Sequence, residues 1–334
     1  MTRQSTSIRL LSELPAWDQF VSSTTSGVIF IRKAWVETLA EVFSVTPKVV
    51  LSQSDAGIRG ALLVLERERG PLKISASPPA SLFNGMILDD SIRGSESSTR
   101  EMLAELLEVF RKEYSFGTFF VPTWTRESML PIGPLCRWTP QLTRLVPLRP
   151  FDETMSGFGR SVRYNIRHAD KNGVTLKESD DVDEAVRLIR ASYRRHAVLP
   201  PFPVPLLGKW IRKLLDLGIA QPFFAVDDTG RNRAVRVMVP DPPRVYDWLA
   251  GSDAEGSKVR ASHWLVANIM KRFSSEGYST FDFMGVNTPG IREFKRSFGG
   301  EDVSYGIVTV YKHAAAHLLH VANDRLVHAR RKWR

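Results

Sequence analysis

The sequence predicts an α/β (α+β) protein built from two similar units in tandem, each a mixed central sheet flanked by helices. Its 334 residues, of which 43% are hydrophobic, are enough for two domains that each bury a core. In the second half, a meander of strands is followed by helix, strand, helix and strand. The first half carries a weaker version of this order, so we infer the duplication from element order and not from a sequence repeat.

The first half alternates helical and extended patterns. Apolar residues at helical spacing predict helices at Pro15–Val21, Arg32–Phe43 and Ser97–Glu113. Aliphatic or alternating segments predict strands at Ile8–Leu11, Lys48–Ser52, Ile58–Arg67 and Gly117–Val121. We expect Ser98 or Thr99 to cap the longest helix. The prolines of Pro122–Pro140 favour a loop there.

The second half is expected to begin near Thr143. Turns rich in Asp, Pro and Gly separate the three strands of an antiparallel meander, at Ala220–Asp227, Arg233–Val239 and Val245–Ala250. Further strands are predicted at Val174–Glu178, Thr280–Met284 and Val303–Tyr311. Helices are predicted at Phe158–Lys171, from Asp180 or Asp181 to about His196, and at Leu206–Leu217, Ser262–Glu276 and Pro289–Phe298. We therefore expect domains at 1–142 and 143–312, with an appended basic helix at 313–334.

Composition limits the classes of partner and site. The formal net charge of +10 favours anionic partners such as phosphate-bearing substrates, nucleic acid or lipid. The single cysteine, Cys136, excludes an internal disulfide and a cysteine-clustered zinc site, and the histidines lack metal spacing. No apolar signal segment and no run of 18 apolar residues occurs. We expect a cytoplasmic location, with peripheral contact to the inner face of the membrane as an alternative.

One predicted helix carries a row of cations. Between residues 160 and 171, the basic side chains at steps of three, four and four share one face: Arg160, Arg163, Arg167 and Lys171. Apolar residues at 162, 166 and 169 lie on the opposite face. Arginine donates two parallel hydrogen bonds to a phosphate, so the row favours a diphosphate or nucleic-acid contact. The alternative is a solvated face with salt bridges.

Two stretches carry a resemblance to a known family. Arg160–Val174 is a basic helix ending in a Lys-Asn-Gly turn, and Phe281–Glu301 is a glycine-ended strand followed by a helix with a Phe-Lys pair. In this order they resemble the Fem (FemAB-like) family of peptidyltransferases, which add amino acids to cell-wall precursors. Asn84–Asp90 is a weaker match. The resemblance covers most of residues 1–312 and implies tandem GNAT-like acyltransferase domains. Predicted acetyltransferases of polysaccharide or lipid modification form a related branch with the same pattern.

The resemblance implies direct transfer of an acyl or aminoacyl group to an amine of a cell-envelope precursor. It places Lys295 near the reacting carbonyl, where a fixed cation would stabilise the developing oxyanion. The alternative for Lys295 is a surface position. Phe294 beside it would contact substrate, and Arg163, Arg167 and Lys171 would hold anionic groups of a nucleotide-linked or lipid-linked acceptor.

Three further candidates have two interpretations each. Asp282 points to the opposite face of its strand from Phe281 and Phe283. It could be the general base for the incoming amine or a structural carboxylate. Tyr246 and Trp248 share one face of a strand and could line a substrate cleft or belong to the core.

The donor and the tail remain open on sequence alone. No cofactor is expected to be tightly bound, and the donor is either an aminoacyl-tRNA or an acyl thioester of coenzyme A or a carrier protein. In simple acetyltransferases the loop at Gly251–Lys258 would grip the coenzyme A pyrophosphate, but Asp253 and Glu255 oppose it. The basic tail 312–334 could contact an anionic membrane or tRNA, or pack on the second domain.

Two other functions are kept as alternatives. One is an N-acyltransferase that uses coenzyme A or a carrier protein and acts on a small metabolite or sugar. The other is a non-catalytic module that binds RNA or a membrane through the basic helix and tail.

Overall fold

A computed structural model describes residues 5–76, 80–196, 200, 202–286 and 288–318. The chain divides into two compact units, one of Met1–Pro140 with Tyr305–Arg334 and one of Gln141–Ser304. It passes from one unit to the other within β7 (Cys136–Pro147) and again within β13 (Glu301–Tyr311). The end of β13, which sequence analysis placed in the second domain, pairs with a strand of the first unit. The domain boundary between residues 142 and 143 stays a proposal.

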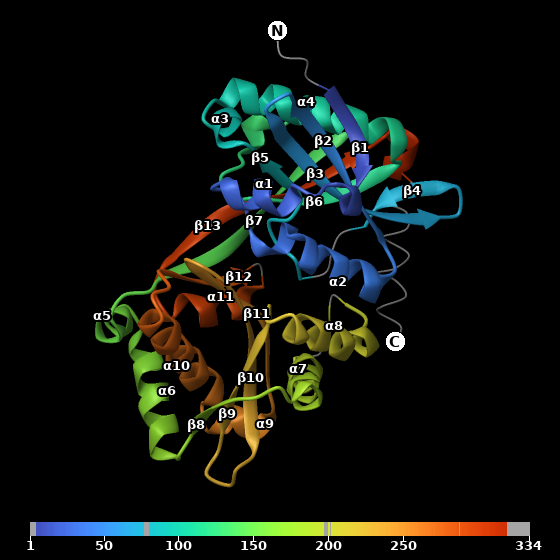
Figure 1. Ribbon diagram of the computed structural model, residues 1–334. Helices are drawn as coiled ribbons and strands as arrows, with labels where there is room; N and C mark the ends of the chain where they lie inside the picture. Colours follow the sequence, from blue (N-terminus) through green and yellow to red (C-terminus); the bar gives the residue numbers. More distant parts are fainter. Residues whose placement is uncertain (1–4, 77–79, 197–199, 201, 287, 319–334) are drawn as a thin grey trace. The chain divides into compact units, whose positions relative to one another are not determined.

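The first unit is a mixed sheet in the order β1-β2-β3-β4-β6-β13, with β5 also paired to β3. Its strands are β1 (Ser5–Leu10), β2 (Thr46–Ser54), β3 (Gly57–Arg69), β4 (Leu72–Ser75), β5 (Met86–Leu88) and β6 (Phe116–Val121). Its helices are α1 (Trp17–Ser23), α2 (Lys33–Phe43), α3 (Asp90–Arg93) and α4 (Glu96–Glu113). Short 3₁₀ turns lie at Leu11–Glu13, Ile29–Ile31 and Glu127–Met129. Figure 1 shows α4 across the strands of this sheet.

Helix α4 supplies the core of the first unit. Its apolar stripe, which includes Leu103, Leu106 and Phe110, packs with buried residues of β2, β3 and β6. The helix starts after Ser95, whose hydroxyl accepts a hydrogen bond from the Ser98 amide at 3.3 Å. The expected cap at Ser98 or Thr99 was therefore wrong, because the helix begins earlier than its apolar stripe. The proline-rich stretch also contains the start of β7, which the loop prediction missed.

The second unit is a sheet in the order β7-β12-β11-β10-β9-β8. Its remaining strands are β8 (Thr175–Glu178), β9 (Gln221–Val226), β10 (Asn232–Asp241), β11 (Arg244–Ser252) and β12 (Thr280–Gly285). Its helices are α5 (Phe151–Ser156), α6 (Arg160–Lys171), α7 (Val182–Arg195), α8 (Val204–Asp216), α9 (Ala254–Lys258), α10 (Ala261–Ser275) and α11 (Pro289–Arg296). The predicted elements of this half are present, and the short helices α5 and α9 are additional.

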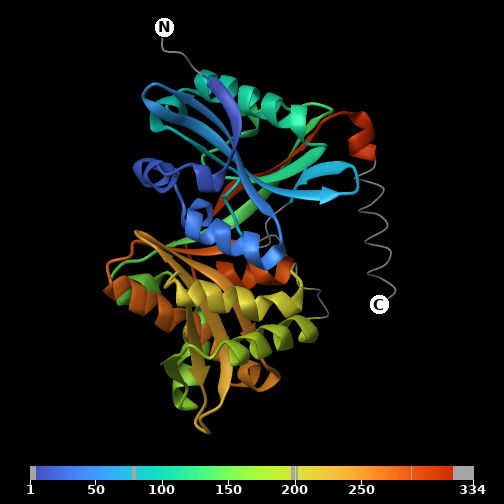
Figure 2. The same ribbon diagram turned by 45° about the vertical axis from the view of Figure 1, so that its right-hand side comes forward.

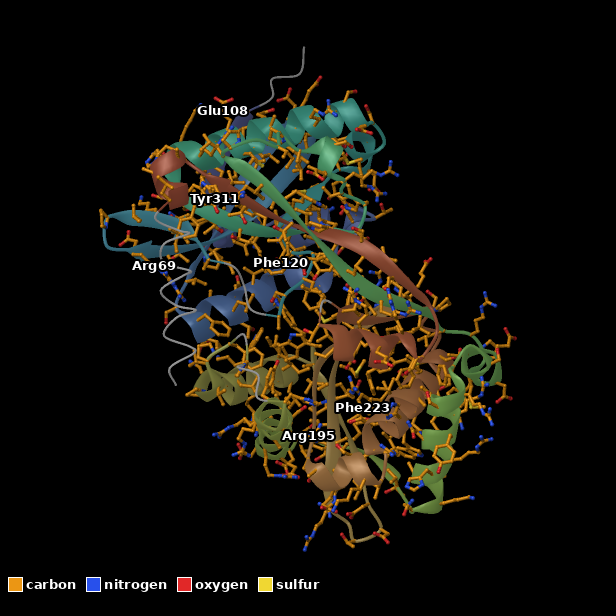
Figure 3. The ribbon with its side chains drawn as sticks, turned by 180° about the vertical axis from the view of Figure 1, so that it is seen from behind. Arg69, Glu108, Phe120, Arg195, Phe223 and Tyr311 are labelled. Carbon is orange, nitrogen blue, oxygen red and sulfur yellow. The ribbon has the colours of Figure 1, made fainter. Side chains whose placement is uncertain are left out.

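Helices cover both faces of this sheet, α7 and α8 on one side and α6 with α10 on the other (Figures 1 and 2). Phe223, labelled in Figure 3, belongs to the core under α10, where its ring lies 6.0 Å from that of Phe273. The Asp181 carboxylate caps α7 by accepting from the Glu184 amide at 3.0 Å. Gly173 ends the turn after α6 with φ +65°, a conformation that favours glycine. Among the helices that the structure describes, none combines the length and apolar character needed to cross a bilayer.

The ladder between β11 and β12 is short. These strands are parallel and pair from Arg244–Thr280 to Tyr246–Asp282. On its other side β11 is antiparallel to β10, and the register shifts so that Val237 faces Leu249 while Met238 faces Asp247. This leaves Trp248 as the extra residue of a β-bulge, a feature that re-aims side chains and is frequent near active sites.

Candidate active site

Lys295 lies where the β11–β12 ladder ends. Helix α11 follows β12 directly and starts after Thr288, with a proline in its first turn. From its last turn, Lys295 Nζ donates to the carbonyl oxygens of Phe283 at 2.6 Å and Gly285 at 2.9 Å. These two bonds fix the ammonium against the end of β12. An ammonium has three N–H donors, so one remains for another acceptor in the part of the chain that the structure describes.

The surroundings make the Lys295 ammonium easier to deprotonate. Burial lowers its pKa from 10.5 to about 8, and the nearby Arg236 guanidinium acts in the same direction. The carboxylates of Asp247 and Asp282 oppose this by favouring the charged form. Lys295 therefore stays mostly protonated at neutral pH.

A buried ion pair next to Lys295 was missed by sequence analysis. Arg236 Nη1 on β10 lies 2.5 Å from Asp247 Oδ2 on β11, and the two side chains are 7% and 1% exposed. The other carboxylate oxygen, Asp247 Oδ1, is buried without a hydrogen-bond partner among the described residues. Burial raises the pKa of Asp247, against the effect of Arg236. A charged residue inside each of two apolar strands was the available signal, because such residues are seldom buried without a reason.

Aromatic rings border this pair. The Arg236 guanidinium carbon lies 5.4 Å from the centroid of the Phe294 ring, within cation–π range. Phe294 in turn contacts His263 of α10, with ring centroids 4.8 Å apart. Burial lowers the pKa of His263 to about 4, with smaller contributions from Arg236 and Arg260. His263 is therefore neutral at pH 7 and adds no positive charge to the site.

Asp282 is fully engaged. Its Oδ1 accepts from the Thr143 hydroxyl at 2.5 Å and the Met284 amide at 2.7 Å, and its Oδ2 lies 3.4 Å from Arg244 Nη1. Burial raises its pKa, while these contacts act in the opposite direction. Met284 itself has φ +58°, so the carboxylate holds a tight turn at the end of β12. These contacts support the structural interpretation of Asp282 over the general-base interpretation.

Tyr246 and Trp248 are both buried. Tyr246 is 1% exposed and Trp248 is 5% exposed. The Trp248 ring packs edge-on against Trp210 of α8, with centroids 4.6 Å apart. Burial raises the pKa of Tyr246. These positions support their interpretation as core residues.

The cationic row on α6 is divided. Arg163 Nη1 donates to the carbonyl oxygens of Ser156 and Phe158, at the junction of α5 and α6. Arg167 and Lys171 are exposed to solvent. The Gly159 amide donates to the Ser297 carbonyl at 2.7 Å, which brings the start of α6 beside the end of α11. A cavity shared by this row and Lys295 stays a proposal.

The acidic side chain in the loop before α10 is paired with donors of the chain itself. Asp253 caps α9 by accepting from the Gly256 amide at 2.7 Å, and its other oxygen lies 3.4 Å from Arg233 Nη1 and 3.7 Å from Arg187 Nη1. Arg195, labelled in Figure 3, donates to the Ser252 and Asp253 carbonyl oxygens. A carboxylate of the chain thus occupies the amide and arginine donors that a diphosphate would need.

The sequence from 156 to 296 matches the family model described as "Acetyltransferase (GNAT) domain". This stretch contains the meander, α10, β12 and the lysine of α11. This region of the second unit is therefore similar to GNAT acetyltransferase domains. No curated protein sequence matches the chain.

Solved structures share the fold of the chain. FemX has a TM-score of 0.68 at 14% identity, covering 91% of this chain and 96% of that chain. The L-PGS of Bacillus licheniformis has a TM-score of 0.52 at 15% identity, covering 88% and 97%. A tandem GNAT protein from the clavulanic acid biosynthesis pathway has a TM-score of 0.51 at 10% identity, covering 93% and 99%. At these identities the likeness establishes the fold, which confirms the expected GNAT-type architecture.

Proposed function

We propose that the protein transfers an acyl or aminoacyl group directly to an amine of a cell-envelope precursor. The observation that carries this proposal is the Lys295 ammonium, fixed by the Phe283 and Gly285 carbonyl oxygens at the end of a short parallel ladder. The similarity of the fold to FemX and to an L-PGS supports an envelope precursor as acceptor.

Lys295 would act on the oxyanion of the reaction. The acceptor amine attacks the ester or thioester carbonyl carbon, and the C–O or C–S bond to the donor breaks after a tetrahedral intermediate. The proton lost by the amine goes to the leaving oxygen or sulfur, so charge balances. The remaining N–H of Lys295 would donate to the intermediate's oxygen, which is worth about 3–4 kcal/mol in comparable sites. Phe294 beside it would form part of the substrate wall.

We propose that the donor binds without placing a diphosphate at the start of α9. Asp253 already accepts from the Gly256 amide and pairs with Arg233 there. Displacing this carboxylate by a coenzyme A diphosphate would break the cap and both contacts. This favours an aminoacyl-tRNA, or a thioester carried on a protein, over free acyl-coenzyme A.

A panel of donors tests the proposal. Purified protein would be incubated with aminoacyl-tRNAs, acyl-coenzyme A thioesters and acyl carrier protein, together with amine-bearing envelope precursors, and transfer followed by mass spectrometry. Lys295→Met is expected to lower kcat by about 10²–10³. The control is Lys258→Met, because this side chain is 72% exposed in the same unit. Equal losses in both variants, or no transfer with any donor, would refute the proposal.

The exposed end of the α6 row is proposed to hold an anionic partner, either a phosphate-bearing acceptor or tRNA. Arg167→Glu with Lys171→Glu is expected to raise KM for that substrate and to weaken the salt dependence of its binding. Arg272→Glu on α10 serves as control, because its side chain is 52% exposed and of the same type. If RNA binds tightly and no transfer occurs in any assay, the results would support a non-catalytic RNA-binding module over an enzyme.

The cellular location and the basic C-terminal segment bear on the acceptor. We propose that the protein acts in the cytoplasm, at the inner face of the membrane when its acceptor is lipid-linked. The basic helix expected at 313–334 lies mostly outside the described residues, which include only a helical stretch at 314–318.

A further inference from the structure

Asp247 has a feature that a purely structural ion pair does not need. A buried arginine–carboxylate pair is stabilising only when both carboxylate oxygens find donors. Here Arg236 binds Oδ2 at 2.5 Å, while Oδ1 is buried without a partner in the described structure. An unsatisfied buried acceptor costs about 1–3 kcal/mol, which two apolar side chains at these positions would avoid.

Asp247 lies where the pairing of β11 with both of its neighbours changes. The bulge at Trp248 and the end of the β11–β12 ladder after Tyr246 both fall next to Asp247. Beyond this point β12 offers its Phe283 and Gly285 carbonyl oxygens to Lys295. Asp247 thus follows the last paired residue of β11 as Phe283 follows that of β12, and its carboxylate favours the charged form of Lys295.

The charges that face Lys295 come from three strands. Asp247 on β11 and Asp282 on β12 attract the ammonium, and Arg236 on β10 repels it. Of these, Asp247 has the larger effect among the carboxylates, and Asp282 is already held by Thr143, Met284 and Arg244. His263 on α10 is neutral above about pH 4 and faces Phe294. Of the two carboxylates, Asp247 therefore favours the charged form of Lys295 more strongly.

We propose that Asp247 is a positioning residue for transfer, which acts through Lys295 by keeping its ammonium protonated and directed at the end of β12. Arg236 limits this effect by holding one of the two carboxylate oxygens. The inference rests on the proposed role of Lys295 in the reaction. It assigns the Arg236–Asp247 pair a function in setting the pH range of activity, which neither residue would have as part of the core.

Competitive amine labelling tests this without any substrate. The full-length protein would be labelled with trace acetic anhydride from pH 6 to 11, and the modification of Lys295 measured by mass spectrometry. The wild-type midpoint is expected near 8. Asp247→Asn is expected to lower this midpoint by about one unit, because an opposite charge is lost. Asp302→Asn removes a paired carboxylate that does not face Lys295 and should leave the midpoint unchanged.

A second variant covers the case in which Asp247→Asn does not fold. Arg236→Gln keeps a hydrogen-bond donor for Asp247 and removes the repelling charge, so it should raise the Lys295 midpoint above the wild-type value. A midpoint that moves in neither variant, or moves equally in Asp302→Asn, would overturn the inference. Because labelling needs no turnover, its failure is distinguishable from a failure to find transfer activity. Where transfer is measured, the basic limb of the kcat profile should follow the labelling midpoint in each variant.

Discussion

Gly251 is the position where a single methyl group should have a large effect. It lies on β11 against helix α7, and a Cβ atom built there would be 2.4 Å from Ile189 N and 2.5 Å from both Ile189 Cα and Leu188 C. Carbon atoms in contact prefer about 3.5–4.0 Å, so α7 would have to move by about 1 Å. All three obstacles are backbone atoms, which cannot rotate away. Overpacking of this kind costs about 1–3 kcal/mol.

The assay is urea unfolding followed by circular dichroism. With slopes of about 1–3 kcal/mol per molar urea, Gly251→Ala should lower the unfolding midpoint by about 1 M. Gly208→Ala on α8 is the matched control, because its nearest neighbour would be Val186 Cγ2 at 3.7 Å and an alanine in a helix stabilises by about 0.5–1 kcal/mol. A Gly251→Ala midpoint equal to that of wild type, or an equal loss in both variants, would show that the close approach of α7 to β11 is wrong.

Three other outcomes are expected. Arg236→Met should destabilise the protein by about 3–5 kcal/mol, because it leaves the buried Asp247 carboxylate without its partner; urea unfolding with a loss under 1 kcal/mol would contradict this. Thr143→Val should cost about 1–3 kcal/mol, because Asp282 loses a hydroxyl donor, and a thermal melt equal to wild type would argue against that contact. The pKa of His263 is lower in the folded state, about 4 against 6.5, so the unfolded chain binds more protons and the free energy of unfolding falls as the pH drops from 6.5 to 4. His263→Gln should make the free energy of unfolding less dependent on pH in this range. An unchanged pH dependence would rule out burial of this ring.

The secondary structure of the second unit followed closely from the sequence. Apolar periodicity and turn residues predicted the meander of β9, β10 and β11, and the cap of α7 at Asp181 was among the two residues expected. The first unit was harder, because β4 and β5 are short and carry little periodic signal. The cap of α4 was wrong, because several serines precede the apolar stripe and only the backbone selects Ser95.

The candidate site was only partly accessible from sequence. Lys295 and Phe294 were recognised through a family motif, and the structure gives Lys295 its two carbonyl partners. The Arg236–Asp247 pair was missed, because alternation along a strand shows which residues share a face but not which strand lies beside it. Arg163, expected at an anionic substrate, also contacts backbone carbonyl groups through Nη1, which no side-chain pattern could indicate.

The sequence by itself determined the order of the longer helices and of most strands, the basic row on α6 and the pairing of a phenylalanine with Lys295 on a short helix. These are local properties, set by residue spacing along one element. Only the tertiary structure decided that two oppositely charged side chains from β10 and β11 are buried near that lysine, and that Asp253 pairs with Arg233. Such contacts join residues far apart in the chain, and their energies depend on burial and strand register.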